Sequence, residues 1–383
     1  MHKLTDHLVT CKRCVMDSTD EKISFDENGF CNHCSSYLKG LDIQKDERIK
    51  FHMQIEEIKK KESKYNCLIG ISGGLDSTFL LIHAVKDLGL KPLAVHVDNG
   101  WNTGLASKNI SKTLNSLKID LYTEVLDWEE FRLMQLAMLE SGTPDLEAPT
   151  DLFINYSMRK IAKKFNIKFI LTGTNLQTEG IMGANWSYGQ RDPIYLKGIF
   201  KKFIKKNPKA LPFQSLISSF FEQLNNRISI IRPLRFIDYS QKSAVERCKK
   251  VVDWAEYPRK HGESFITRFY QNYFLPQRFN YDKRKAHYSS LIMNGDITRN
   301  EAIEKLTTEH IASRDVEADI LYFCIKLKIS TEYFEELMKR PKKYHFDYKS
   351  FKNTSFYNLG IFLKKIIGTN NFLYRLIRNL IIY

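Results

Sequence analysis

Asn66-Cys67-Leu68-Ile69-Gly70-Ile71-Ser72-Gly73-Gly74-Leu75-Asp76-Ser77-Thr78 is the stretch that decides the fold of this chain. Its first six residues form an apolar run of strand length, and the pattern from Thr78 to Leu88 predicts a helix. The adjacent glycines between them let backbone N–H groups turn toward an anion, and the helix start adds its positive dipole end. The stretch therefore predicts a strand, a loop that binds phosphate or pyrophosphate, and a helix.

The loop differs from two common nucleotide-binding motifs. It is shorter than a Walker A loop and lacks the Gly-Lys-Ser/Thr that would follow, which disfavours kinase and GTPase chemistry. It also lacks the G-x-G-x-x-G of dinucleotide-binding proteins. Asp76 would repel a phosphate unless it orients the loop or holds a magnesium ion.

Strand and helix patterns alternate outward from the loop. Strands are predicted at 92–97, 120–125 and 167–171, and helices at 52–63, 107–117 and 151–164. Apolar strands separated by helices predict an α/β fold with a doubly wound, mostly parallel sheet. Polar, glycine-bearing turns follow two of these strands, at Val97-Asp98-Asn99-Gly100 and at Thr172-Gly173-Thr174-Asn175. Because ligands bind beyond the carboxyl ends of such strands, both turns should border the same site as the loop.

Four of the seven cysteines form two Cys-x2-Cys pairs, Cys11 with Cys14 and Cys31 with Cys34. Their separation is typical of a structural zinc site, and Asp26-Glu27-Asn28-Gly29 predicts a hairpin turn between them. Zinc would stabilise a segment with too few apolar residues to fold alone. Four closed ligands leave no free thiolate, which disfavours a redox role.

The chain has 383 residues and an ordinary globular composition, which predicts more than one structural unit. We expect a zinc-binding segment at 1–45, the loop-bearing domain at 46–256 and a helical region with a basic tail at 257–383. In the last region, Thr298-Arg299-Asn300-Glu301 predicts the capped start of a helix that ends near His310. Residues 356–383 predict an amphipathic helix, packed on its own domain or docked on a membrane surface. No signal peptide or membrane-spanning run is found, so we expect a cytoplasmic protein, with peripheral attachment to the inner membrane face left open.

The net charge of +15 is concentrated in two places. Six lysines and no acidic residue lie between Pro193 and Phe221, and ten Lys or Arg follow from Lys339 onward against the single acid Asp347. The six are Lys197, Lys201, Lys202, Lys205, Lys206 and Lys209, interleaved with Phe200 and Phe203, which we expect at the surface. A solvated face and a docking site for an acidic protein, a phosphosugar or a membrane both fit this pattern.

The motif Ser72-Gly73-Gly74-Leu75-Asp76-Ser77 resembles the signature of the PP-loop ATP pyrophosphatases, which have the adenine nucleotide alpha-hydrolase fold. The turns at 97–100 and 173–174 are similar to the strand ends of GMP synthetase in that superfamily. The resemblance implies that Ser72, Gly73, Gly74 and Ser77 bind the pyrophosphate end of ATP and that Asp76 serves Mg²⁺ or the loop. It also implies that Asp98, Gly173 and Thr174 border the nucleotide, and that Asp76 and Ser77 are catalytic.

A narrower resemblance rests on Lys260-His261-Gly262-Glu263-Ser264, on 267–270 and on 282–287, together with the zinc motif and the loop. These stretches resemble the N-acetyl sugar amidotransferases of lipopolysaccharide and surface-glycan biosynthesis, up to about Leu306. The resemblance implies a C–N ligase that turns the acetamido group of a nucleotide-linked sugar into an acetamidino group, with release of AMP and pyrophosphate. It implies ATP, Mg²⁺ and structural Zn²⁺. Substrate contacts are expected from Lys260, His261, Glu263, Ser264 and Arg268.

The same resemblance implies imported ammonia. Residue 2 is His2 rather than the N-terminal cysteine of a glutaminase, and no glutaminase-like half is present. Ammonia would come from glutaminase and cyclase-like subunits that resemble imidazole glycerol phosphate synthase.

The sequence leaves two other functions open. A PP-loop tRNA-modifying enzyme of the thiolase kind would need a sulfur-carrying cysteine near ATP, and only Cys67, Cys248 and Cys324 remain, none of them well placed. A zinc-ribbon scaffold that binds nucleic acid would not need an intact phosphate loop. We therefore expect no stable nucleic-acid partner.

Overall fold

The computed structural model describes residues 8–183, 185–186, 192–211, 213, 228–258, 260–308, 316–355 and 357–358. Five parallel strands form one sheet in the order β3-β2-β1-β4-β5. They are β1 (Cys67–Gly70), β2 (Pro92–Asp98), β3 (Leu121–Val125), β4 (Phe169–Leu171) and β5 (Ser229–Ile231). The chain builds outward from β1 to β3 and then crosses to the other side of β1, so the switch point lies where β1 and β4 end. The α/β doubly wound sheet is confirmed.

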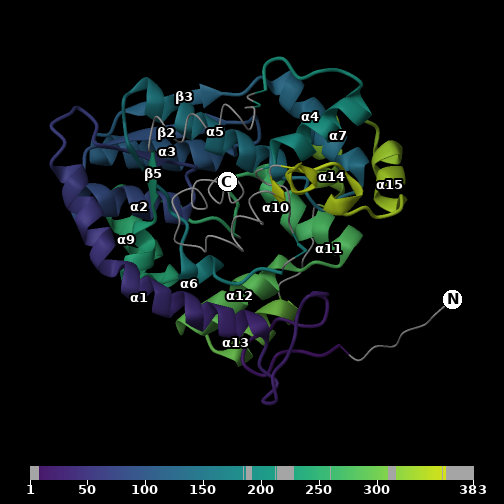
Figure 1. Cartoon of the computed structure of the whole chain (residues 1–383), viewed down its shortest axis with the longest axis horizontal. Coiled ribbons are helices and arrows are strands. Elements are labelled where there is room, and N and C mark those ends of the chain that lie inside the picture. The colour runs from purple at the N-terminus through teal and green to yellow at the C-terminus, as the bar shows by residue number, and fades with distance from the viewer. Residues whose placement is uncertain are drawn as a thin grey trace.

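The helices before the C-terminal region are α1 (Asn32–Lys59), α2 (Leu75–Lys86), α3 (Gly104–Leu117), α4 (Trp128–Ser141), α5 (Ala148–Lys164), α6 (Leu176–Glu179), α7 (Pro193–Ile204) and α9 (Gln241–Val252). The C-terminal region contains α10 (Phe265–Phe269), α11 (Leu275–Phe279), α12 (Lys283–Asn294), α13 (Arg299–Thr308), α14 (Val316–Leu327) and α15 (Thr331–Lys339). A π-helical turn (Tyr270–Phe274) joins α10 to α11, and short 3-10 turns lie at Pro233–Phe236, His345–Asp347 and Phe351–Asn353. The helical C-terminal region is confirmed (Figure 1).

Helices cover both faces of the sheet because alternate strand side chains point to opposite faces. Ile69 belongs to an apolar cluster with residues of α1, α2, α3 and α9, whereas Leu68 packs with α5 on the other face. A third cluster joins α4, α7 and the C-terminal helices with the four cysteines. The C-terminal region thus packs beside the sheet domain (Figure 1).

The helix predicted from residue 52 begins instead at Asn32, so this prediction was wrong about its start. Its buried residues lie near the two ends, Cys34 and Tyr37 at one and Phe51, Ile55 and Ile58 at the other. The solvated middle carries no apolar stripe, which is why periodicity missed it. The capping box at Thr298 is confirmed by reciprocal hydrogen bonds with Glu301.

Two further predictions concern the phenylalanines of α7 and the C-terminal helix. In α7, Phe200 is buried at 1% exposure and Phe203 packs against the core, so the prediction that they lie at the surface was wrong. The helix is amphipathic: its apolar face packs on α4 while the lysines from Lys197 to Lys209 stay exposed.

The helix predicted at 356–383 lies outside the described residues apart from 357 and 358. Within the described ranges, no helix has the length and apolar character needed to cross a bilayer.

Candidate active site

The loop between β1 and α2 closes on itself through its two serines. The Ser72 and Ser77 hydroxyl oxygens lie 3.2 Å apart, and the Ser77 hydroxyl donates to the Gly74 carbonyl at 3.1 Å. The Gly74 N–H donates to the Ser72 hydroxyl at 3.2 Å. Short hydroxyl side chains thus shape the loop where it opens into the N-terminus of α2, which favours an anion.

Gly73 has a conformation and a packing that exclude a side chain. Its φ of +82° is left-handed, and a Cβ would lie 2.6 Å from the Ala106 carbonyl oxygen. Its own carbonyl accepts from the Trp254 indole N–H at 2.9 Å and the Tyr257 hydroxyl at 3.0 Å. Helix α3 and the segment after α9 therefore pack against the loop and fix the position of Gly73.

Asp76 lies in the first turn of α2 and accepts a hydrogen bond from the Tyr239 hydroxyl. Burial, followed by the nearby Glu179 carboxylate, raises the pKa of Asp76 to about 6. A carboxylate here fits either role expected of it, since one oxygen meets Tyr239 and the group can also ligate a hard cation such as Mg²⁺. Tyr239 lies 163 residues away and was not foreseen as a partner.

The two strand-end turns differ in their placement. Gly173 backs onto the loop, because a Cβ there would lie 3.2 Å from the Asp76 carbonyl. Gly173 and Thr174 line the cavity described next. Asp98 instead accepts from the Gly100 N–H at 2.8 Å and from the Asn102 amide at 3.1 Å, which shapes its own turn.

A cavity of about 650 Å³ lies at the carboxyl edge of the sheet. Its lining includes the loop serines and strand-end residues together with side chains of α5, α10 and α12. A smaller space of about 260 Å³ shares Ser72, Ser77 and Gly173 with it and reaches Trp254 and Tyr257. The sheet domain and the C-terminal helices therefore share one site, at the switch point where α/β sheets bind ligands.

Four of the five expected substrate contacts line this cavity: Lys260, His261, Glu263 and Ser264. Backbone pairing brings them there, because the Thr103 N–H donates to the Glu263 carbonyl at 3.0 Å and Asn102 forms a bridge with Ser264. A Cβ on Gly74 would lie 2.8 Å from the Glu263 carboxylate. The fifth, Arg268, lies outside the lining and pairs with Asp319 at 2.7 Å.

Charges within this segment are paired. His261 lies 3.7 Å from the Glu263 carboxylate, and the Lys260 ammonium lies 3.5 Å from that of Glu179. Burial alone would raise the pKa of Glu263, but the neighbouring His261 and Lys260 lower it. Lys260 thus lies near the phosphate loop, and His261 and Lys260 balance the negative charge of Glu263.

The cavity wall also includes titratable residues to which the sequence assigned no role: Glu147, Asp151, Lys283 and His287. Lys283 and His287 lie in the quoted stretch 282–287, so the resemblance was their signal. Burial lowers the pKa of Lys283, and burial together with Lys260 lowers that of His287, whose Nδ1–H donates to the Thr178 carbonyl at 3.0 Å. Glu147 and Asp151 open α5, where no motif marks them.

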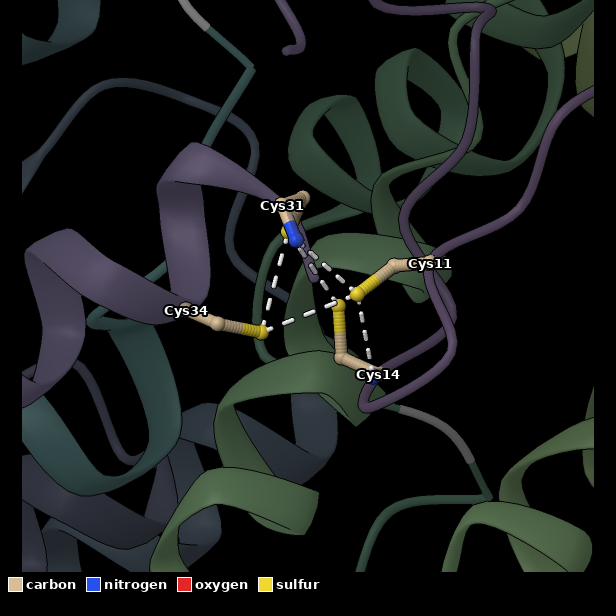
Figure 2. A group of neighbouring side chains, drawn as sticks. All are labelled: Cys11, Cys14, Cys31 and Cys34. Atoms are coloured by element: carbon tan, nitrogen blue, oxygen red, sulfur yellow. Dashed lines mark hydrogen bonds between the residues drawn. The ribbon is translucent and has the colours of Figure 1, made fainter. Parts of the chain in front are cut away.

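The four cysteine sulfurs form one buried group (Figure 2). All four lie within 4.8 Å of one another, with Cys14–Cys31 and Cys31–Cys34 both at 3.7 Å and Cys11–Cys34 at 3.9 Å. Four thiolates held about 2.3 Å from one zinc ion lie about 3.8 Å apart at tetrahedral corners. The cluster could therefore bind zinc, and the predicted hairpin turn is confirmed by the bridge between Phe25 and Cys31.

Backbone donors and two helices surround the cluster. The Cys31 N–H donates to the Cys11 sulfur at 3.2 Å. The Arg299 guanidinium of α13 donates to the Cys11 and Cys14 carbonyls at 3.1 Å, and Lys285 of α12 pairs with Asp17. We call residues 8–34 the four-cysteine segment; it rests on α12 and α13 (Figure 1).

The remaining three cysteines belong to the hydrophobic core. Cys67, Cys248 and Cys324 are buried, and none of them lines the cavity. Burial raises the pKa of Cys67 and of Cys248 to about 12 and that of Cys324 to about 11. None is a reactive thiolate near the loop, as a sulfur-transfer enzyme would need.

Residues 263–364 match the family model described as the C-terminal domain of WbpG-like LPS biosynthesis proteins. The chain carries a WbpG-like C-terminal domain. This domain supplies Thr267, Lys283 and His287 to the cavity, and the sheet domain supplies the loop. The WbpG-like domain and the sheet domain thus line the site together.

Curated relatives match over parts of their length. The chain is 28% identical over 171 residues to an uncharacterized protein of Methanocaldococcus jannaschii, covering 43% of this chain and 59% of that protein. It is 30% identical over 125 residues to the glutamine-hydrolyzing GMP synthase of Campylobacter hominis, covering 32% of this chain and 24% of the synthase. Both matches span less than two thirds of the relative. Over the matched part, the chain is therefore related to ATP-using PP-loop enzymes.

Two solved structures are similar at low TM-scores. The NMN synthetase of Francisella tularensis has a TM-score of 0.31 and 13% identity, over 82% of this chain and 98% of that one. The U34-tRNA thiolase of Methanococcus maripaludis, solved with its [4Fe-4S] cluster, has a TM-score of 0.33 and 12% identity, over 78% and 89%. At these scores neither structure bears on the activity of this chain.

Proposed function

We propose that this protein is an ATP-dependent sugar amidotransferase. It adenylates the acetamido oxygen of a nucleotide-linked N-acetyl sugar and lets ammonia replace AMP, which forms an acetamidino group. One observation supports this above the others: a pyrophosphate-type loop and the charged side chains of a WbpG-like domain line the same cavity. An ATP site and a glycan-substrate site would then meet in one space.

The proposed reaction requires no nucleophilic side chain from the protein. The acetamido oxygen attacks the α-phosphorus of ATP, and the bond to pyrophosphate breaks. Ammonia then forms a bond to the acetamido carbon as the carbon–oxygen bond to AMP breaks. Ser72, Gly74 and Ser77 would bind the departing pyrophosphate, and Lys260 would stabilise its charge. Magnesium, bound at Asp76, would supply further charge neutralisation.

The thiolase alternative finds no such support. Its chemistry requires a cysteine sulfur beside ATP, and the cysteines outside the four-cysteine segment are buried and do not line the cavity.

The test is a product assay with ATP, Mg²⁺, ammonium and diacetamido nucleotide sugars. We expect AMP, pyrophosphate and amidine in equal amounts, with the sugar seen by mass spectrometry to change from amide to amidine. ADP and inorganic phosphate as products would contradict the proposal. Copurifying nucleic acid, together with AMP formation that depends on tRNA, would favour the alternative.

We also propose that a glutaminase with a cyclase-like companion supplies the ammonia, because ammonium dominates over free ammonia at neutral pH. The exposed lysines of the α7 region are the proposed docking surface, since like charges gathered on one face favour an acidic partner. The variant K201E/K202E/K205E/K206E should lose glutamine-dependent turnover with both partner subunits present. It should keep its turnover with high ammonium. Equal loss of both activities, or glutamine use by the isolated chain, would contradict the docking proposal.

A further inference from the structure

Glu147 is a cavity carboxyl that lies outside the phosphate loop and the Lys260–Ser264 segment. It directly precedes α5 and is buried, with 9% of its surface exposed. The Thr267 hydroxyl donates to one carboxyl oxygen at 2.7 Å, and the Thr150 hydroxyl donates to the other at 3.3 Å. Because each oxygen has its own donor, the carboxyl is fixed in orientation while it lines the cavity.

Charged and titratable groups face Glu147 from several elements. Asp151 lies on α5, Lys283 on α12, and Asp145 and Tyr270 lie nearby. The Lys283 ammonium lies 5.3 Å from the centre of the Tyr270 ring. Burial, and to a smaller degree the Asp151 charge, raises the pKa of Glu147 to about 7, against the opposing effect of its hydroxyl donors and Lys283. A carboxyl that titrates near neutral pH can take up a proton and release it within one turnover.

Three neighbouring carboxylates already have partners. In the cavity, Glu179 pairs with Lys260 and Glu263 with His261. Asp76, which lines the smaller space, belongs to the loop and accepts from Tyr239. The carboxyl of Glu147, in contrast, accepts from two neutral hydroxyls, those of Thr267 and Thr150. Among the described residues, Lys283 attracts Glu147 without forming a close ion pair, so a change in the charge of Glu147 breaks none.

We propose that Glu147 is the base that takes a proton from ammonia as it adds to the activated acetamido carbon. The inference rests on the proposed function and deepens it. The nitrogen lone pair forms the carbon–nitrogen bond, and the carbon–oxygen bond to AMP breaks with its electron pair leaving on AMP. One N–H proton passes to the Glu147 carboxylate and from there to water. The two threonine hydroxyls are positioning groups for this step.

The experiment separates the two half-reactions in the full-length protein. Adenylation is followed by exchange of labelled pyrophosphate into ATP in the presence of the nucleotide sugar without ammonium, and amidination by amidine formation with ammonium. Glu147→Gln should keep exchange within a few-fold and lose amidine formation by about 10²-fold or more. Glu147→Asp should recover part of the lost rate. The exposed Glu57→Gln on α1 is the matched control and should match the wild type in both assays.

The pH dependence of the amidination rate distinguishes a base from a residue that only stabilises the structure. Free ammonia is held constant by adjusting total ammonium. The wild-type amidination rate should fall as pH drops below about 7, because the base becomes protonated, and the residual rate of Glu147→Gln should lack this fall.

Several outcomes would overturn the inference. Equal loss of exchange and amidination in Glu147→Gln, with a wild-type Tm, would assign Glu147 to adenylation or sugar binding. An unchanged amidination rate, or an unchanged acidic limb in the variant, would remove it as the base. Failure of the proposed function looks different, because the wild type itself would then show no sugar-dependent exchange.

Discussion

The phosphate loop and the four-cysteine segment are both short and both carry a recognisable motif, yet they are held in different ways. The loop is continuous with β1 and α2, and its serines and glycines contact one another within six residues. The four-cysteine segment has few apolar residues of its own, and its Asp17 carboxylate and Cys14 carbonyl contact α12 and α13 more than 250 residues later. A loop built from neighbours needs only a scaffold, whereas the segment needs both an ion and a distant partner.

The difference matters because α12 serves both regions. Lys283 and His287 face the cavity, while Lys285 pairs with Asp17 and the Ser289 hydroxyl accepts from the Val15 N–H at 3.2 Å. Residues 283 and 287 are one helical turn apart, as are 285 and 289, so the two sets lie on separate faces. The four-cysteine segment therefore supports one wall of the cavity from outside.

The largest effect should come from the loop. Ser77→Ala removes the hydroxyl that meets both Ser72 and Gly74, and AMP formation should fall by about 10²-fold or more. The Tm and zinc content should stay as in the wild type, because the loop scaffold is unchanged. Asp76→Ala should behave alike. Loss of zinc or of fold in these variants would break the distinction between the two regions.

The four-cysteine segment should respond in the opposite way. Metal analysis of the wild type should give about one zinc per chain, and Cys31→Ser should lose it. Limited proteolysis should then cleave within residues 8–34 at a protein concentration where the wild type resists. Activity should fall less than for Ser77→Ala, because α12 loses support while the loop stays intact. A metal-free wild type with a fully protected segment would contradict the zinc assignment.

Lys285→Ala tests the contact between the two regions. Removing the lysine leaves the Asp17 carboxylate, which is 3% exposed, without its cation and should cost about 3 kcal/mol of stability. The Tm measures this loss. Lys249→Ala breaks the exposed pair with Glu256 and is the control, with an expected cost below about 1 kcal/mol. Equal effects of the two variants would mean that the Asp17 contact does not couple the regions.

The smallest effect should come from Tyr239→Phe, which removes the hydroxyl that donates to Asp76. The loss of one hydrogen bond should lower turnover by a few-fold up to about tenfold, with little change in Tm. Tyr65→Phe removes a similar bond to Asp120 on the surface and should leave turnover unchanged. A loss as large as that of Ser77→Ala would mean that Tyr239 contacts a substrate directly.

The sequence predicted the elements whose signal is local. Strands β1, β2 and β4 lie in apolar stretches, and the phosphate loop shows through its glycines and serines. Strand β5 was not predicted. It is as short as β4, but β4 lies in the longer stretch predicted at 167–171, whereas β5 begins with a serine and is followed by Arg232. The surface placement of Phe200 failed because a lysine-rich pattern hides which face of a helix is buried.

The sequence alone determined the sites whose residues lie close together in the chain. These are a loop that suits pyrophosphate and four cysteines that suit one ion. Only the tertiary structure decided that Glu147, Lys260 and Lys283 share a cavity with Ser77, and that Arg268 lies outside it. Residues within one turn of chain have distances set by backbone geometry, which a motif records. Residues as far apart as Ser77 and Glu147, or farther, meet only through the packing of whole helices against the sheet, and no local pattern carries that information.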